Sequence, residues 1–111
     1  MITASFSLAD TAVHTLSDLF AIQHPLEITA QPPIGSFSEL HIVADAGNSG
    51  NVAVSFNSDV NISSKHYGWL LTASSLEIVF CRPQGGESIS PLNIYLAASA
   101  AGQIFHVCGL G

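Results

Sequence analysis

Short runs in which apolar and polar residues alternate dominate this chain and constrain its fold more than any other feature. In residues 2–8, Ile2, Ala4, Phe6 and Leu8 alternate with small polar residues. A period of two indicates an extended strand with one buried face. Similar short segments, which we also predict to be strands, lie at 26–30, 39–45, 51–56, 67–71, 75–80, 92–98 and 103–108.

The segments between these runs are rich in turn-forming residues. They include "FNSDVNISSKH" (56–66), "RPQGGESISP" (82–91) and "SAAG" (99–102). Seven or eight short strands with regular turn signals are typical of an antiparallel sandwich, jelly roll or barrel. A chain of 111 residues fits one domain. We therefore predict a single all-β domain over residues 1–111, a jelly-roll-like antiparallel β-sandwich.

One segment, residues 10–23, allows two interpretations. Val13, Leu16 and Phe20 share one face of a helix that Asp10 could cap. The Thr, Val and His residues in its first half are poor helix formers, however. Two short extended segments are therefore favoured over a helix.

The stretch "GNSGN" (47–51) stands between two predicted strands, 39–45 and 51–56. Gly and Asn tolerate the positive φ angles that tight hairpin turns need. We therefore expect a β-hairpin that joins these two strands.

Charged residues make up only 9% of the chain, against about 25% in ordinary soluble domains. The only bases are Lys65 and Arg82, and the net charge is −6. This balance disfavours nucleic acid and anionic membranes as partners, because both attract basic proteins. A surface with few charges is poorly protected against association, so a protein that works in an assembly is favoured.

No apolar run approaches the roughly 20 residues that span a bilayer, and no signal-peptide pattern opens the sequence. We therefore expect synthesis in a cytoplasm. Cys81 and Cys108 should then be reduced, small, half-buried residues without a metal or catalytic role. Whether the two thiols lie close enough to bridge stays open.

Chemical motifs are weak. The five histidines, at 14, 24, 41, 66 and 106, form none of the spacings HxH, HxxxH or HExxH, so we expect no metal or cofactor site. There is no G-x-S-x-G elbow, and the carboxylates are scattered singly. Trp69 and Tyr67 could stack on a sugar, but aromatic residues more often close a core. These residues favour a protein that is not an enzyme.

The C-terminal part contains three phrases: "GNSGNVAV", "YGWLL" and "IYLAASAAGQIFHV". Over roughly residues 40–111 they make the chain resemble a class of small structural proteins of tailed bacteriophages. Two departures are Ser55-Phe56, where a Gly is usual, and "GGESIS" at 85–90, which comes later than expected. The matching residues are Gly47, Asn48, Gly50, Asn51, Val52, Val54, Gly68, Leu71, Ile94, Tyr95, Leu96, Ala98, Ser99, Ala101, Gly102, Gln103 and Val107.

The resemblance implies a capsid decoration (cement) protein. Such a protein would be made in the host bacterial cytoplasm and would bind the exterior of the head. Its partners would be the major capsid protein and further copies of itself, as a homotrimer. Residues 1–8 could be an N-terminal arm that adds a strand to a neighbour, or an edge strand of their own sandwich. The candidate interface residues are Met1, Ile2, Phe6, Leu8, Tyr67 and Trp69.

Three other functions stay open. The protein could be a head–tail connector, tail or head-fibre component of a virion. It could be a carbohydrate-binding module that uses Trp69 and Tyr67. A small hydrolase or metalloenzyme ranks last.

Overall fold

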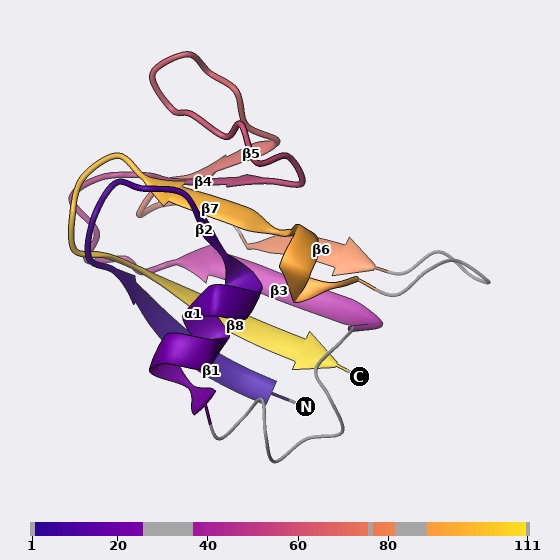
Figure 1. Cartoon of the computed structure of the whole chain (residues 1–111). Helices are drawn as coiled ribbons and strands as arrows, with labels where there is room; N and C mark the ends of the chain where they lie inside the picture. The colour runs from indigo at the N-terminus through magenta and orange to yellow at the C-terminus, as the bar shows by residue number, and fades with distance from the viewer. Residues whose placement is uncertain (1, 26–36, 76, 82–88, 111) are drawn as a thin grey trace.

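The computed structural model describes residues 2–25, 37–75, 77–81 and 89–110. They form two four-stranded antiparallel sheets and one short α-helix, shown in Figure 1. The elements are β1 (Ile2–Leu8), β2 (His14–Thr15), α1 (Leu16–Gln23), β3 (Glu39–Ala44), β4 (Val52–Ser55), β5 (Trp69–Leu71), β6 (Ile78–Cys81), the 3₁₀ turn η1 (Pro91–Asn93), β7 (Tyr95–Ala98) and β8 (Gln103–Leu110).

The strand order identifies the fold as a jelly roll. Sheet A has the order β1-β8-β3-β6, and sheet B has the order β2-β7-β4-β5. The first strand pairs with the last, the second with the seventh, the third with the sixth and the fourth with the fifth. This nested pairing, wrapped into two sheets, is the jelly-roll arrangement. The prediction of an all-β sandwich is confirmed.

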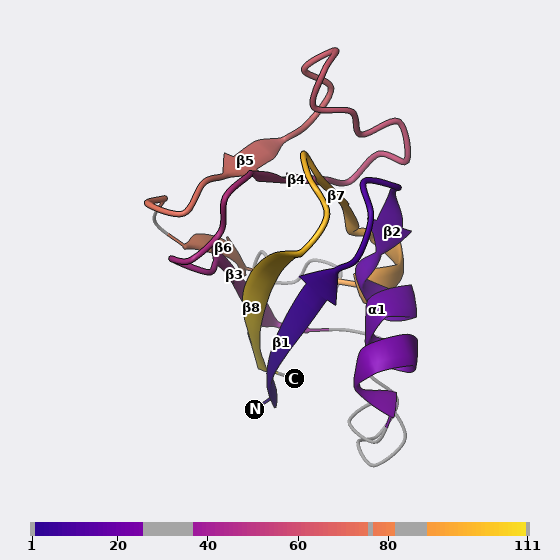
Figure 2. The ribbon, with the colours of Figure 1, turned by 90° about the vertical axis from the view of Figure 1, so that its left-hand side faces the viewer.

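The core lies between the two sheets and under α1. The alternation in β1 is realised as predicted, because every second side chain is buried from Ile2 to Leu8. Phe6 stacks on Phe105 with ring centroids 5.1 Å apart and meets Phe20 of α1 edge-on at 4.8 Å. The helix therefore covers the open end of the core beside β1, as the turned view in Figure 2 shows.

The preference for two extended segments at 10–23 was wrong over its second half. Only His14–Thr15 is extended, and α1 starts at Leu16. The Thr15 side chain accepts a hydrogen bond from the Asp18 backbone N–H at 3.1 Å, which caps the helix in place of Asp10. Leu16, Leu19 and Phe20 are buried. Burial of this face outweighs the weak helix propensity.

The predicted hairpin at 47–51 was also wrong. β3 belongs to sheet A and β4 to sheet B, so the stretch is a corner that crosses between the sheets. Among the described residues, only Lys65 and Gly102 have positive φ. A positive φ therefore does not explain why glycines occur in the corner. At Gly50 a Cβ would lie 2.5 Å from Ser99 Oγ, which means that glycine is needed there for close packing.

The polar residues of the corner are explained by hydrogen bonds to the β7–β8 turn and to β8. Asn48 Nδ2 donates to the Ile104 carbonyl at 2.7 Å, and the Ile104 N–H donates back to Asn48 Oδ1 at 2.8 Å. Gly50 N–H donates to the buried Gln103 Oε1 at 2.7 Å. These bonds fix the position where the chain leaves one sheet for the other.

Residues 2–8 are a strand of their own sandwich and not a free arm. β1 pairs with β8 along its whole length and forms one edge of sheet A. Ile2, Phe6 and Leu8, predicted as interface residues, are 9%, 1% and 1% exposed, so their side chains face the chain's own core. Met1 and the predicted strand at 26–30 lie outside the described residues.

The strand predicted at 92–98 begins later than expected. Pro91–Asn93 form η1, and β7 starts only at Tyr95. Leu92 is consequently 62% exposed, whereas Leu96 is buried. The proline explains the difference, because it fits the first turn of a helix and cannot donate to a strand ladder.

Candidate functional site

Three aromatic rings from different elements meet where the edge strands of the two sheets lie together. They are Phe56, just after β4, Trp69 of β5 and Phe80 of β6, and we name them the aromatic cluster. Trp69 and Phe80 have centroids 4.8 Å apart, Phe56 and Phe80 5.3 Å, and Phe56 and Trp69 5.7 Å, all edge-to-face. Phe56 is 48% exposed and Trp69 37% exposed, whereas Phe80 is buried.

Two of the three rings, Phe56 and Trp69, form an apolar surface that stays partly exposed. Large aromatic side chains bury 150–250 Å² each when a partner covers them, and they dominate the energetics of interfaces. The neighbouring Val79 of β6 is 43% exposed and adds to the apolar surface at this edge. Sequence reasoning missed Phe56 and Phe80, since the alternation places each of them in a strand but not beside the other.

Beside the cluster lies an open hollow of about 380 Å³ that contains the two predicted aromatic residues together. Tyr67 and Trp69 line it with Asp59, Lys65 and His66. His66 Nδ1 lies 3.9 Å from Asp59 Oδ2 at its rim. The ring of Tyr67 is half-buried and packs against a small second core of Ala53, Val60 and Ala97. Most of the exposed aromatic surface in this hollow therefore comes from Trp69 and from Phe56, which also lines it.

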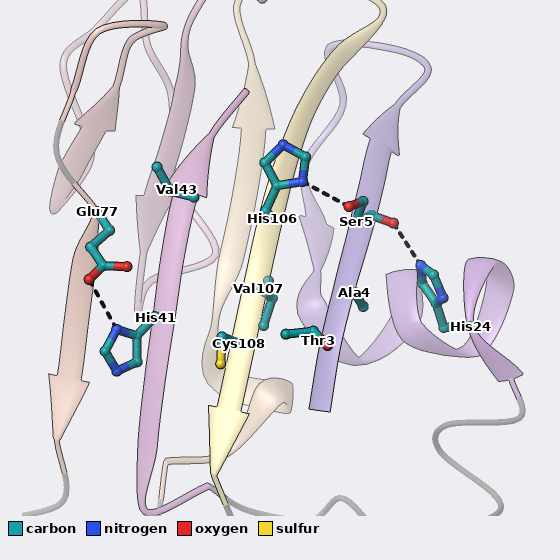
Figure 3. A pocket seen from close by; sticks show the side chains of 10 residues that line it. All are labelled: Thr3, Ala4, Ser5, His24, His41, Val43, Glu77, His106, Val107 and Cys108. Carbon is teal, nitrogen blue, oxygen red and sulfur yellow. Dashed lines mark hydrogen bonds and ion pairs between the residues drawn. The ribbon is translucent and has the colours of Figure 1, made fainter. Parts of the chain in front are cut away.

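A second hollow, of about 410 Å³, lies on the outer face of sheet A. Figure 3 shows that its side chains come from β1, β3 and β8, from Glu77 just before β6 and from His24 just after α1. Ser5 and His106 are direct cross-strand neighbours on β1 and β8. Ser5 Oγ lies 2.8 Å from His106 Nδ1, and His106 Nε2 lies 2.8 Å from Asp45 Oδ1.

One end of this hydrogen-bonded chain, Asp45, is held in its ionised form. The hydrogen bond from His106 is the main cause that lowers the pKa of Asp45, and the Gly47 N–H adds to it. An ionised carboxylate can only accept, so His106 Nε2 donates to Asp45; in the neutral imidazole with this tautomer, Nδ1 accepts from the Ser5 hydroxyl. Sequence reasoning missed this set, because its members are distant in the chain and come together only through the pairing of β8 with β1 on one side and with β3 on the other.

The same residue types serve as nucleophile, base and orienting acid in acyl transfer. That chemistry also needs N–H donors aimed at the developing oxyanion. Near Ser5, the Ser7 N–H already donates to Gln23 Oε1 at 2.9 Å. The backbone groups of Ala4 and Phe6 turn toward β8, because alternate residues of a strand point to opposite sides. The N–H groups of Ala4, Phe6 and Ser7 are therefore not available as oxyanion donors.

The same face holds His41 between two carboxylates. Its Nε2 lies 2.7 Å from Glu39 Oε1, and its Nδ1 lies 3.3 Å from Glu77 Oε1. The hydrogen bond to Glu39, followed by the one to Glu77, raises the pKa of His41 above its ordinary value.

Both cysteines are free thiols. Cys81 of β6 lies opposite Glu39 of β3, and Cys108 of β8 lies opposite His41 of the same strand. One strand therefore separates them, and they are also offset by two residues along the sheet. Two strand spacings are about 9.6 Å, which exceeds the reach of a disulfide.

Within the part of the chain that the structure describes, no three His, Cys, Asp or Glu side chains are grouped so that they could hold a metal ion. No helix formed by the described residues has the length and apolar character to cross a membrane. Comparisons with protein-family models, with curated proteins and with solved structures found no match to this chain.

Proposed function

We propose that this protein is a non-enzymatic structural protein of a bacteriophage virion. In this proposal it is a capsid decoration protein that binds the outer face of the assembled head through the major capsid protein. The observation that carries the proposal is the aromatic cluster, an exposed apolar surface on a small domain with few charges. The resemblance of residues 40–111 to phage structural proteins supplies the virion context.

The physics of decoration suits such a surface. A protein that binds the assembled lattice and not the free subunits stabilises the lattice by mass action. Phe56 and Trp69 are suitable anchors, since exposed aromatic residues at the centre of an interface often contribute most of its binding energy. The net charge of −6 keeps such a protein away from the packaged DNA.

The test is co-sedimentation of the purified protein with mature, undecorated heads, with bound copies counted by quantitative mass spectrometry. Saturation at hundreds of copies per head supports decoration. A dozen or fewer copies would instead place the protein at a connector, tail or fibre position. No binding at micromolar concentration would refute a virion role on the head.

A matched pair of variants tests the surface. Phe56→Ala should weaken head binding about tenfold or more, as expected for an interface anchor. Ile22→Ala is the control, because Ile22 is 74% exposed on α1 and lies outside the cluster. Equal binding of both variants and the unchanged protein would remove the aromatic cluster from the proposal.

A second candidate function, carbohydrate binding, is favoured by the hollow that Trp69 and Tyr67 share with Asp59 and His66. An exposed aromatic ring beside polar side chains can stack on a sugar ring and hydrogen-bond its hydroxyls. Trp69 is the only tryptophan, so its fluorescence reports binding directly. A saturable change on titration with host surface glycans would support this function, and an unchanged spectrum would refute it.

A further inference from the structure

Sheet A has two edges, and the chain covers only one of them within the described residues. On β1, Gln23 of α1 bonds both backbone groups of Ser7, accepting from its N–H at 2.9 Å and donating to its carbonyl at 2.7 Å. His24 Nε2 donates to the Ser5 carbonyl at 2.6 Å. These side chains occupy the positions where another strand would pair, as the placement of α1 beside β1 in Figure 2 illustrates.

The opposite edge is β6, and the hydrogen-bond pattern shows which of its residues face outward. The Asp45 N–H donates to the Ile104 carbonyl at 3.0 Å, so odd-numbered residues along β3 direct their backbone groups toward β8. Even-numbered residues of β3 must then face β6, because alternate residues of an antiparallel strand point to opposite sides. Leu40 therefore bonds to its partner Phe80.

By the same alternation, Ile78 and Phe80 bond to β3, whereas Val79 and Cys81 direct their N–H and carbonyl groups away from the sheet. Neither Val79 nor Cys81 has a hydrogen-bond partner on that side among the described residues. Val79 is 43% exposed and Cys81 is exposed. Unprotected, uncharged edges of this kind are templates for pairing with another strand.

We propose that β6 pairs antiparallel with β6 of a second copy of this chain, around a two-fold axis. With Phe80 opposite Phe80 of the second copy, Val79 faces Cys81 of the second copy, and Cys81 faces its Val79. Each of these two pairs exchanges both backbone hydrogen bonds, which gives four bonds from a strand of four residues. The result is one continuous eight-stranded sheet made of two copies of sheet A.

Charge and packing both suit this register. The sequence Ile-Val-Phe-Cys carries no charge, so two copies of a chain with net charge −6 meet without like charges in the seam. The two Glu77 side chains lie at opposite ends, offset by six residues or about 20 Å. Phe80 and its counterpart are a close pair, about 4.5 Å between Cα atoms. The two Phe80 rings, the buried members of the two aromatic clusters, therefore lie beside each other at the axis.

This interface closes after two copies, because an isologous edge pair leaves no free β6 edge. It therefore gives a dimer where the resemblance to decoration proteins implies a trimer. The inference does not rest on the proposed function, and it is tested on the purified chain without phage heads.

The first experiment measures molar mass by sedimentation equilibrium and light scattering at 1–100 µM. The expected species has twice the chain mass of 11.6 kDa. Val79→Pro removes the outward N–H and leaves the bonds to β3 intact, so it should raise the dimer dissociation constant at least tenfold. Val79→Lys, which adds a charge at the seam, should act in the same direction.

Thr3→Lys is the matched control, since Thr3 lies on the outer face of β1 at the opposite edge of the same sheet. Circular dichroism verifies that each variant is folded. A monomer or a trimer of the unchanged protein would overturn the proposal. A dimer that withstands both Val79 substitutions as well as it withstands Thr3→Lys would also overturn it.

A cross-linking experiment tests the register. In a Cys108→Ser background, Val79→Cys places the introduced thiol opposite Cys81 of the second copy, with Cα atoms about 5.5 Å apart, which is within disulfide reach. Oxidation should give a covalent dimer. Adding Cys81→Ser should abolish it, because the two introduced thiols are offset by two residues. Cross-linking that is absent from the first protein, or equal in both, would refute the register.

Discussion

Replacing Asn48 by Ala removes the two hydrogen bonds that attach the corner at 47–51 to β8. The amide of Asn48 bonds both the carbonyl and the N–H of Ile104, at 2.7 and 2.8 Å. One neutral hydrogen bond contributes about 0.5–1.5 kcal/mol of net stability. Because both groups are partly accessible to water, we expect Asn48→Ala to lower the free energy of unfolding by about 1–2 kcal/mol.

Urea unfolding followed by the fluorescence of Trp69 measures this loss directly. Asn48→Asp keeps the shape of the side chain, but a carboxylate accepts from the Ile104 N–H and cannot donate to its carbonyl. We therefore expect Asn48→Asp to lose at least as much stability as Asn48→Ala. The denaturant slope should stay unchanged in both variants, because the folded state keeps its compactness.

Asn93→Ala is the matched control, because Asn93 is exposed in η1 and its side chain has no hydrogen bond to the described residues. It should change stability by less than about 0.5 kcal/mol, as surface substitutions usually do. If Asn48→Ala fell within 0.5 kcal/mol of this control, the corner would not depend on its side-chain bonds and the reasoning would be refuted.

Three further predictions concern packing, edge protection and titration. Gly109→Ala would place a Cβ 2.5 Å from the buried Phe37 ring, so it should lower stability by about 1–3 kcal/mol in thermal unfolding; an unchanged midpoint would contradict this. Gln23→Ala uncovers both backbone groups of Ser7 on the β1 edge and should increase light scattering on storage, whereas unchanged scattering would show that this part of the edge needs no cover. Glu39→Gln should lower the raised pKa of His41 in an NMR titration. Because folding raises the pKa of His41, protonated His41 stabilises the folded state. This contribution is complete below the unfolded-state pKa of about 6.5 and is lost as pH rises through the folded-state pKa. An unchanged pKa of His41 in Glu39→Gln would exclude Glu39 as the cause.

The fold class followed from the sequence because burial of one strand face leaves a period of two that local reading detects. Each strand that the described residues form beyond β2 lies in or overlaps a segment predicted as a strand. The errors occurred where tertiary contacts determine the secondary structure or the sheet that a segment joins. Leu16–Gln23 is helical because its apolar face meets Phe6, and a local propensity scale contains no information on that contact.

The hairpin prediction at 47–51 failed for a related reason. Turn composition indicates that the chain reverses or bends, but not whether the next strand joins the same sheet. The partners of Asn48 and Gly50 lie more than 50 positions away, at Ile104 and Gln103. Of the candidate site, Trp69 and Tyr67 were predicted from their residue type, whereas Phe56 and Phe80 became neighbours only through the packing of two sheets.

The pairing of the first strand with the last has a consequence for how this protein is made. Ile2 lies opposite Gly109, so β1 is synthesised long before β8, the strand that pairs with it among the described residues. At roughly 5–20 residues per second, the apolar face of β1 waits on the order of 5–20 s for β8. Pairing over so long a stretch of chain also makes folding slow once synthesis ends. We therefore expect the apolar face of β1 to be prone to aggregation until β8 is made, and a chain truncated before β8 to aggregate more readily than the unchanged chain.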